Sequence, residues 1–108
     1  MFGLFKTKKN YENVDALTFN KLMGETANAV LLDVRTSAEF KEISIDGAIN
    51  MDDMGKEFSQ KISELDKNKT YFVYCRSGNR SENTCNLMSE MGFEHLYNLL
   101  GGLTKWTF

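Results

Sequence analysis

The chain has 108 residues, 42% of them hydrophobic, which suits one compact domain with a buried core. A formal net charge of −2 argues against binding to nucleic acid or to bulk membrane, and no stretch approaches the roughly 20 apolar residues of a membrane span. Two cysteines and one histidine, without close ligand spacing, argue against a disulfide framework and predict no metal site.

Residues 1–10 precede the first predicted element and contain Phe2, Leu4 and Phe5. Their apolar part is too short for a signal peptide, and lysines follow it rather than precede it. We expect a flexible tail; the alternative is a weak contact of the three apolar residues with a partner or a membrane surface. Without a targeting signal, the predicted location is the reducing cytoplasm, where Cys75 can stay a free thiol.

Apolar periodicity and turn residues predict strands and helices that alternate along the chain. In chain order we expect a strand at 11–14, a helix at 16–23, a strand at 29–34, a short helix at about 36–42, a short strand at 48–51, a helix from about 52 to 65, a strand at 71–75, a helix at 81–91 and a last strand within 93–100. The run 29–34 is nearly continuous apolar, which is typical of a strand buried on both faces. The alternation predicts an α/β fold with a mainly parallel sheet, whose sites gather at the C-terminal ends of its strands.

Short motifs mark where several of these helices begin or end. Thr36 and Glu39 have the spacing of a capping box at the start of the second helix. Asp52 and Asp53 suit the positive end of the third helix, and Gly92 suits the end of the fourth. The inward-facing positions of the third helix are predicted to be Met54, Phe58, Ile62 and Leu65.

Cys75 ends an apolar strand and is followed by a tight loop and a helix. The loop residues are Arg76, Ser77, Gly78, Asn79, Arg80 and Ser81. Backbone N–H groups and the positive end of the helix converge there, which favours a thiolate and forms an anion-binding cup around the sulfur. A cysteine at a strand end is often inert packing, but packing requires neither the flexible residues nor the charges of this loop. We therefore predict that Cys75 is a nucleophile with a pKa below the ~8.5 of a free thiol.

Three sets of residues resemble the signatures of rhodanese-like domains, in the expected order and spacing. They are Leu32-Asp33-Val34-Arg35 with Glu39-Phe40 and Gly47-Ala48-Ile49-Asn50; then Cys75-Arg76-Ser77-Gly78-Asn79-Arg80-Ser81; then Gly92-Phe93 and Leu99-Leu100-Gly101-Gly102-Leu103 with Trp106. The match covers roughly residues 11 to 107. It implies a central sheet of five mainly parallel strands, flanked by helices on both faces, in one domain over residues 11–108. The chain lacks the His and Pro that the family often has at positions 44 and 46.

The resemblance also implies a sulfurtransferase of the thiosulfate:cyanide type, without a metal or a cofactor. In this interpretation Cys75 takes a sulfane sulfur from a donor such as thiosulfate or a persulfide and passes it to a thiol or cyanide. The backbone of residues 76–80 would surround the persulfide, and Arg80 would brace the loop. Ser77 stands where some thiosulfate-specific members have a Lys.

Two other functions are compatible with the same loop. The first is a persulfide carrier or adaptor that acts on a partner protein with little free turnover. The second is a cysteine phosphatase, which has five residues between its Cys and its Arg. Only four residues separate Cys75 from Arg80, and this shorter loop suits a single sulfur atom better than a phosphate.

Other polar residues have both a structural and a functional interpretation. Asp33 and Arg35 are interpreted as a charge pair that fixes the first loop together with Glu39, rather than as substrate ligands. Cys85 is expected in the core rather than as a resolving thiol. His95 is expected at the surface of the last strand rather than as a general base.

Overall fold

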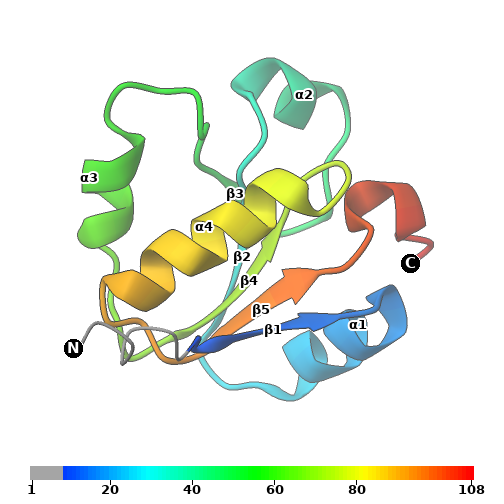
Figure 1. Ribbon diagram of the computed structural model, residues 1–108. Coiled ribbons are helices and arrows are strands. Elements are labelled where there is room, and N and C mark those ends of the chain that lie inside the picture. The colour runs from blue at the N-terminus through cyan, green and yellow to red at the C-terminus, as the bar shows by residue number, and fades with distance from the viewer. Residues whose placement is uncertain (1–8) are drawn as a thin grey trace.

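The computed structural model describes residues 9–108, which form a layered α/β structure around one parallel sheet (Figure 1). The strands are β1 (Tyr11–Val14), β2 (Ala29–Asp33), β3 (Ile49–Asn50), β4 (Thr70–Tyr74) and β5 (Leu96–Leu99). Their order in the sheet is β1-β5-β4-β2-β3, and every neighbouring pair is parallel. The helices are α1 (Ala16–Glu25), α2 (Ser37–Glu42), α3 (Phe58–Ser63), α4 (Asn79–Glu90) and the 3₁₀ helix η2 (Gly102–Lys105). The predicted fold class and five-stranded parallel sheet are confirmed.

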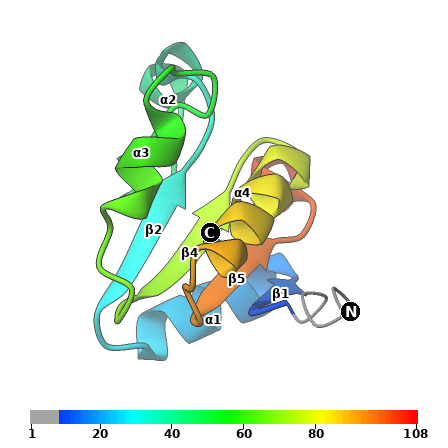
Figure 2. The same ribbon diagram turned by 60° about the vertical axis from the view of Figure 1, so that its left-hand side comes forward.

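The side chains of β4 alternate between two cores, one on each face of the sheet. Tyr71 and Val73 belong to the core that α3 and α4 complete, whereas Phe72 and Tyr74 belong to the core that α1 completes. Figure 2 shows α3 and α4 on one side of the sheet and α1 on the other. Each fully buried side chain of this size contributes about 1.5–3 kcal/mol. The central strand is therefore a rigid support for whatever follows its C-terminal end.

The predicted tail, residues 1–10, lies largely outside the described residues, and so does the alternative contact by Phe2, Leu4 and Phe5. Asn10 is described and is already part of the fold. Its backbone N–H donates to Ser89 Oγ at 3.0 Å, and its Nδ2 donates to the Phe93 carbonyl at 3.2 Å. Asn10 therefore packs with the domain, although the predicted domain begins one residue later, at residue 11.

The third helix begins later than the sequence predicts, at Phe58 instead of about residue 52. The Asp52 side chain accepts a hydrogen bond from the Met54 N–H at 2.8 Å, and the Asp52 carbonyl accepts one from Gly55. An aspartate that bonds nearby N–H groups in this way stabilises a turn in competition with a helix. Met54, predicted to face inward, is 74% exposed, whereas Phe58, Ile62 and Leu65 do pack against the core.

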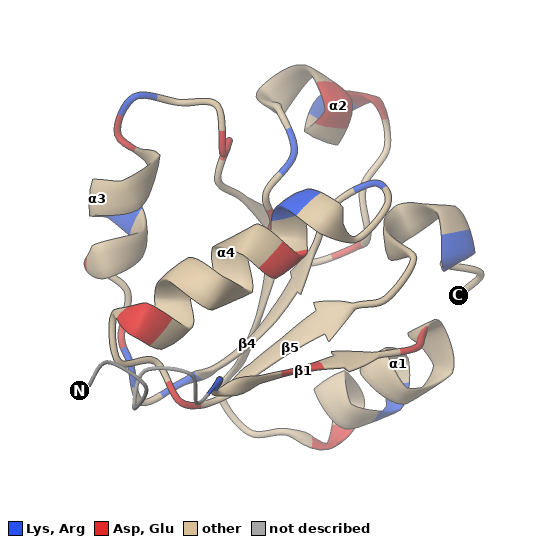
Figure 3. Ribbon diagram, in the orientation of Figure 1, with Lys and Arg blue, Asp and Glu red and all other residues tan. Residues whose placement is uncertain are grey.

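Charged residues of both signs are distributed over the elements that Figure 3 shows, without a face of one sign in that view. A basic position lies at the start of α4, and acidic positions lie on α2. No helix within residues 9–108 is long and apolar enough to cross a membrane.

Candidate active site

Cys75 lies directly after β4, at the C-terminal end of a strand in the interior of the sheet. β5 and β2 flank β4, and its residues from Tyr71 to Tyr74 are almost completely buried. Cys75 is also buried, and its thiol is free of any disulfide. The location agrees with the sequence prediction, because ligand sites of parallel α/β sheets lie outside the C-terminal ends of the strands.

The loop after Cys75 is shorter than predicted. Helix α4 begins at Asn79, so Asn79, Arg80 and Ser81 form its first turn instead of belonging to the loop. Gly78 makes this early start possible because it adopts a left-handed conformation with a φ of 100°. A Cβ at Gly78 would also lie only 3.1 Å from the Leu99 carbonyl oxygen. Glycine is therefore required there by both the backbone conformation and the space.

Three donors converge on the sulfur of Cys75. The Gly78 N–H lies 3.1 Å from Sγ, the Ser81 N–H lies 3.4 Å from it, and the Ser81 hydroxyl lies 3.3 Å from it. The Ser81 N–H is one of the first-turn groups of α4 that have no acceptor within the helix. The N-terminus of the twelve-residue helix adds the positive end of its dipole near the same sulfur.

These donors shift the acidity of the thiol. Burial raises the pKa of Cys75, but the hydrogen bonds from the Ser81 hydroxyl and from backbone N–H groups lower it by more. The net effect is a pKa below the ordinary value, which favours the thiolate. The thiolate is the reactive form of a cysteine, so the arrangement can supply a nucleophile without a neighbouring base.

The exposed side chains around Cys75 make no hydrogen bond to its sulfur, unlike the buried Ser81 hydroxyl. Arg76 and Ser77 of the loop and Asn79 of the first turn of α4 are exposed, and no hydrogen bond joins their side chains to Cys75 Sγ within residues 9–108. The backbone on this side is held by η2, because the Cys75 carbonyl accepts from Leu103 N at 2.9 Å and the Arg76 carbonyl accepts from Thr104 N at 3.1 Å. The exposed side chains are thus free to meet a donor or an acceptor.

Gly102 makes the close contact with η2 possible. Its φ is 61°, and a Cβ there would lie 2.4 Å from the Arg76 oxygen and 2.6 Å from the Cys75 oxygen. In the sequence, Gly102 stands out only as part of a family signature. Its packing role depends on a contact between segments about 26 residues apart, which no local pattern indicates.

Arg80 braces the loop through two carboxylates. Its two terminal nitrogens donate to Glu39 at 3.2 and 3.3 Å, and its Nη1 lies 3.9 Å from Asp53 Oδ1. Glu39 also closes the predicted capping box of α2 with Thr36. The hydrogen bond from Arg80, followed by that from the Thr36 backbone, lowers the pKa of Glu39 to about 2. Glu39 is predicted to fix the first loop together with Asp33 and Arg35; it accepts from the Thr36 N–H at 3.0 Å, directly after Arg35, and its other partner is Arg80.

Asp33 and Arg35 form a buried ion pair beneath the site. Arg35 Nη2 lies 2.6 Å from Asp33 Oδ2 and also donates to the Ile43 carbonyl at 2.6 Å. The guanidinium lies 5.7 Å from the centre of the Tyr74 ring, and both charged side chains are almost completely buried. The pair holds the turn after β2, because the Arg35 N–H also donates to Asp33, and its burial favours the structural interpretation over substrate binding.

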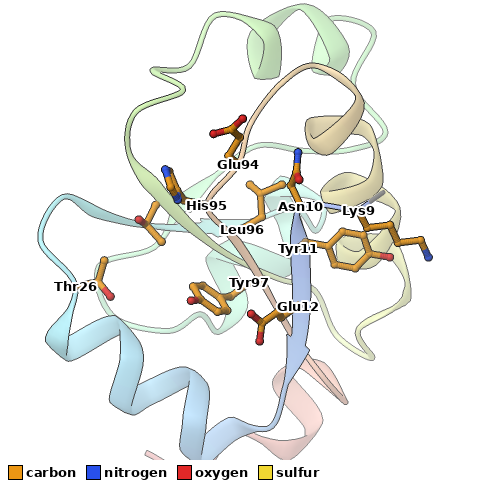
Figure 4. A pocket seen from close by; sticks show the side chains of 10 residues that line it. Lys9, Asn10, Tyr11, Glu12, Thr26, Glu94, His95, Leu96 and Tyr97 are labelled. Carbon is orange, nitrogen blue, oxygen red and sulfur yellow. The ribbon is translucent and has the colours of Figure 1, made fainter. Parts of the chain in front are cut away.

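Cys85 and His95 lie where the structural interpretations place them. Cys85 lies on α4 and is fully buried in the hydrophobic core, and this burial raises the pKa of its thiol. His95 is exposed just before β5, in a polar pocket of about 440 Å³ that also includes Thr26 and Tyr97 (Figure 4). The His95 carbonyl pairs with the N–H of Tyr71, four residues and about 13 Å of strand before Cys75. His95 therefore lies too far from Cys75 to serve as its base, and the raised pKa of Cys85 makes it a poor nucleophile.

Comparisons with known proteins identify relatives in sequence and in fold. Residues 15–108 match the family described as "Rhodanese-like domain". The chain is 30% identical over 92 residues to the thiosulfate sulfurtransferase GlpE of Shewanella oneidensis, covering 83% of this chain and 89% of that protein. It is 33% identical to the tRNA uridine(34) hydroxylase of Cytophaga hutchinsonii over 93% of this chain, but over only 33% of that longer protein. A crystal structure of a rhodanese-related protein from Thermoplasma volcanium superposes with a TM-score of 0.75 at 28% identity, covering 89% of this chain and 90% of that one.

Proposed function

We propose that this chain, which belongs to the rhodanese-like domain family, transfers a sulfane sulfur from a small donor to a thiophilic acceptor through a persulfide on Cys75. The supporting observation is the convergence of three donors on a single sulfur atom at the end of β4. Sulfurtransferase relatives support rhodanese-type sulfur transfer as the reaction class. The proposal covers residues 11–108 as one functional domain.

The first step is an attack by the Cys75 thiolate on the outer sulfur of a donor such as thiosulfate. A new S–S bond forms, the bond between the outer sulfur and the sulfonate breaks, and sulfite leaves with its electron pair. The loop donors favour this step because they hold the nucleophile as a thiolate. No external oxidant or reductant is needed, because one S–S bond replaces another and the transferred sulfur keeps its oxidation state.

The second step regenerates the enzyme. A cyanide ion or a thiolate attacks the terminal sulfur of the persulfide, the S–S bond to Cys75 breaks, and its electrons return to Cys75 Sγ. The N–H groups of Gly78 and Ser81 can then stabilise the thiolate that leaves. Cys75 must remain a free thiol between turnovers. The proposal therefore requires a reducing compartment such as the cytoplasm.

The surroundings of Arg80 support sulfur chemistry over phosphate chemistry. A phosphatase loop directs its arginine at the bound phosphate, but Arg80 is engaged by Glu39 and approached by Asp53. We therefore do not propose a phosphatase.

The test is thiocyanate formation from thiosulfate and cyanide by the wild-type protein, Cys75→Ser and Cys85→Ser. We expect turnover by the wild type and by Cys85→Ser, and none by Cys75→Ser. Thiocyanate formation by Cys75→Ser at the wild-type rate would contradict the proposal. If the wild type accepts one sulfur but turns over only with a protein acceptor, the carrier function replaces the enzyme function.

A further inference from the structure

Asn98 is a buried amide in the sheet, next to the sulfur-transfer loop. It lies on β5, paired with Val73 of β4, and is only 1% exposed. Its Nδ2 donates to the Gly78 carbonyl at 3.2 Å and to Asn13 Oδ1 at 2.9 Å. Its Oδ1 is buried and accepts no hydrogen bond from the described residues.

The unpartnered oxygen makes Asn98 costly for the fold. Leaving a buried polar group without a partner costs about 1–3 kcal/mol. A leucine of similar volume would avoid this loss in a strand whose neighbours Leu96 and Leu99 are apolar, but it would also give up both hydrogen bonds of Nδ2. The amide is therefore explained by the two bonds that its Nδ2 makes.

The Gly78 carbonyl fixes the orientation of that amide. A carbonyl oxygen can only accept, so the Asn98 nitrogen has to face it. The same carbonyl accepts the first hydrogen bond of α4, from Glu82 N at 3.1 Å. Asn98 thus ties the residue that begins α4 directly to the sheet.

We propose that Asn98 is a positioning residue, which holds the Gly78 carbonyl so that the N–H groups of Gly78 and Ser81 stay aimed at Cys75 Sγ. Glycine has the greatest backbone freedom of all residues, and Gly78 lies between the carbonyl that Asn98 holds and the N–H that meets the sulfur. Without the amide, this carbonyl keeps only its bond within α4. The Gly78 N–H is then free to rotate away from Sγ.

A second set of contacts holds the same turn from outside and offers a control. Glu82, in the first turn of α4, accepts from Tyr11 OH at 2.8 Å and from Asn13 Nδ2 at 3.2 Å. Asn13 also accepts from Asn98, but it does not contact Gly78. Asn13→Ala therefore removes a neighbour of the amide and leaves its bond to Gly78 in place.

The inference rests on the proposed role of Cys75, but it is tested without sulfur transfer. Iodoacetamide alkylation of Cys75 is followed against pH by peptide mass mapping in the wild type, Asn98→Leu and Asn13→Ala. For Asn98→Leu we expect alkylation at neutral pH to slow by about three- to tenfold and its midpoint to move upward, with a cooperative unfolding transition retained. Asn13→Ala should keep the wild-type profile. The charged groups in and around the loop, Arg76, Arg80, Glu82, Glu39 and Asp53, are the same in every variant.

A folded Asn98→Leu with the wild-type alkylation profile would overturn the proposal. A loss of stability together with an unchanged midpoint would do the same, because it would make Asn98 merely structural. If Asn98→Leu does not fold, Asn98→Ser is measured in the same way, with the same expected upward shift. Failure of sulfur transfer in Cys75-intact protein with a normal alkylation profile would instead count against the proposed function.

Discussion

Glu39 and Arg80 are 41 residues apart in the chain, yet two N–O contacts of 3.2 and 3.3 Å join their side chains. Glu39 simultaneously closes the capping box of α2, and Arg80 lies in the first turn of α4. One carboxylate therefore connects the helix after β2 to the turn that presents donors to Cys75. The pair is partly exposed, so its contribution to stability is expected to be small.

Replacing Glu39 by Gln should lower stability by up to about 1 kcal/mol at neutral pH. The pKa of Glu39 is lowered from its ordinary 4.5 to about 2 in the fold, so the native state favours the ionised form. Its contribution is then complete above about pH 4.5 and is lost as the pH falls toward 2. Urea unfolding of both proteins between these values should show a difference that shrinks with acidification. A difference that stays constant over this range would contradict the assigned ion pair.

Replacing Gly102 by Ala should damage the loop, because the added Cβ collides with the Arg76 and Cys75 carbonyls and the φ is left-handed. We expect a stability loss of about 1–3 kcal/mol and a marked loss of sulfur transfer. Gly24→Ala is the matched control, since nothing lies within 4 Å of its Cβ position in α1. It should be neutral or stabilising by up to about 1 kcal/mol. Equal effects of the two substitutions on melting temperature and activity would argue against the packing role of Gly102.

Replacing Cys85 by Ala should cost about 1 kcal/mol through a small cavity and leave most sulfur transfer intact. Cys85 is fully buried and its thiol has a raised pKa, so it is a poor nucleophile. The measurement is the melting temperature together with recovery of activity after oxidation and reduction. An unchanged melting temperature with lost recovery would show that Cys85 resolves an oxidised Cys75.

Replacing Arg35 by Met should destabilise the fold by about 3–5 kcal/mol, because Asp33 would remain buried without its partner. The double variant Asp33→Asn with Arg35→Met should recover part of the loss, since no uncompensated charge remains. Chemical denaturation of the two proteins measures the difference. A single variant as stable as the wild type would contradict the stabilising role assigned to the pair.

Local patterns predicted most of the fold correctly, where the physical cause was itself local. The apolar run of β2, the Thr36–Glu39 capping box and the end of α4 near Gly92 depend on residues close in sequence, and all three are observed. The start of α3 differs from the prediction because Asp52, whose charge favours a helix start, stabilises a turn instead.

In the candidate site, too, the features with a local cause are predictable from the sequence and the long-range contacts are not. Cys75 and its glycine-containing loop follow from sequence spacing, but the partners of that loop do not. Asn98 contacts Gly78 across 20 residues, and Arg80 contacts Glu39 across 41. Such contacts depend on the strand order, in which β4 lies between β5 and β2. A polar residue in a strand gives no local indication of which loop it will hold.

The most direct test of the central claim is intact mass spectrometry of the reduced protein after incubation with thiosulfate and, separately, with a small persulfide. The account predicts a gain of one sulfur atom, located on Cys75 by peptide mapping, lost on addition of cyanide and absent in Cys75→Ser. The Cys85→Ala protein should gain the same single sulfur. A wild-type protein that gains no sulfur from either donor, or gains it on Cys85, would contradict the account.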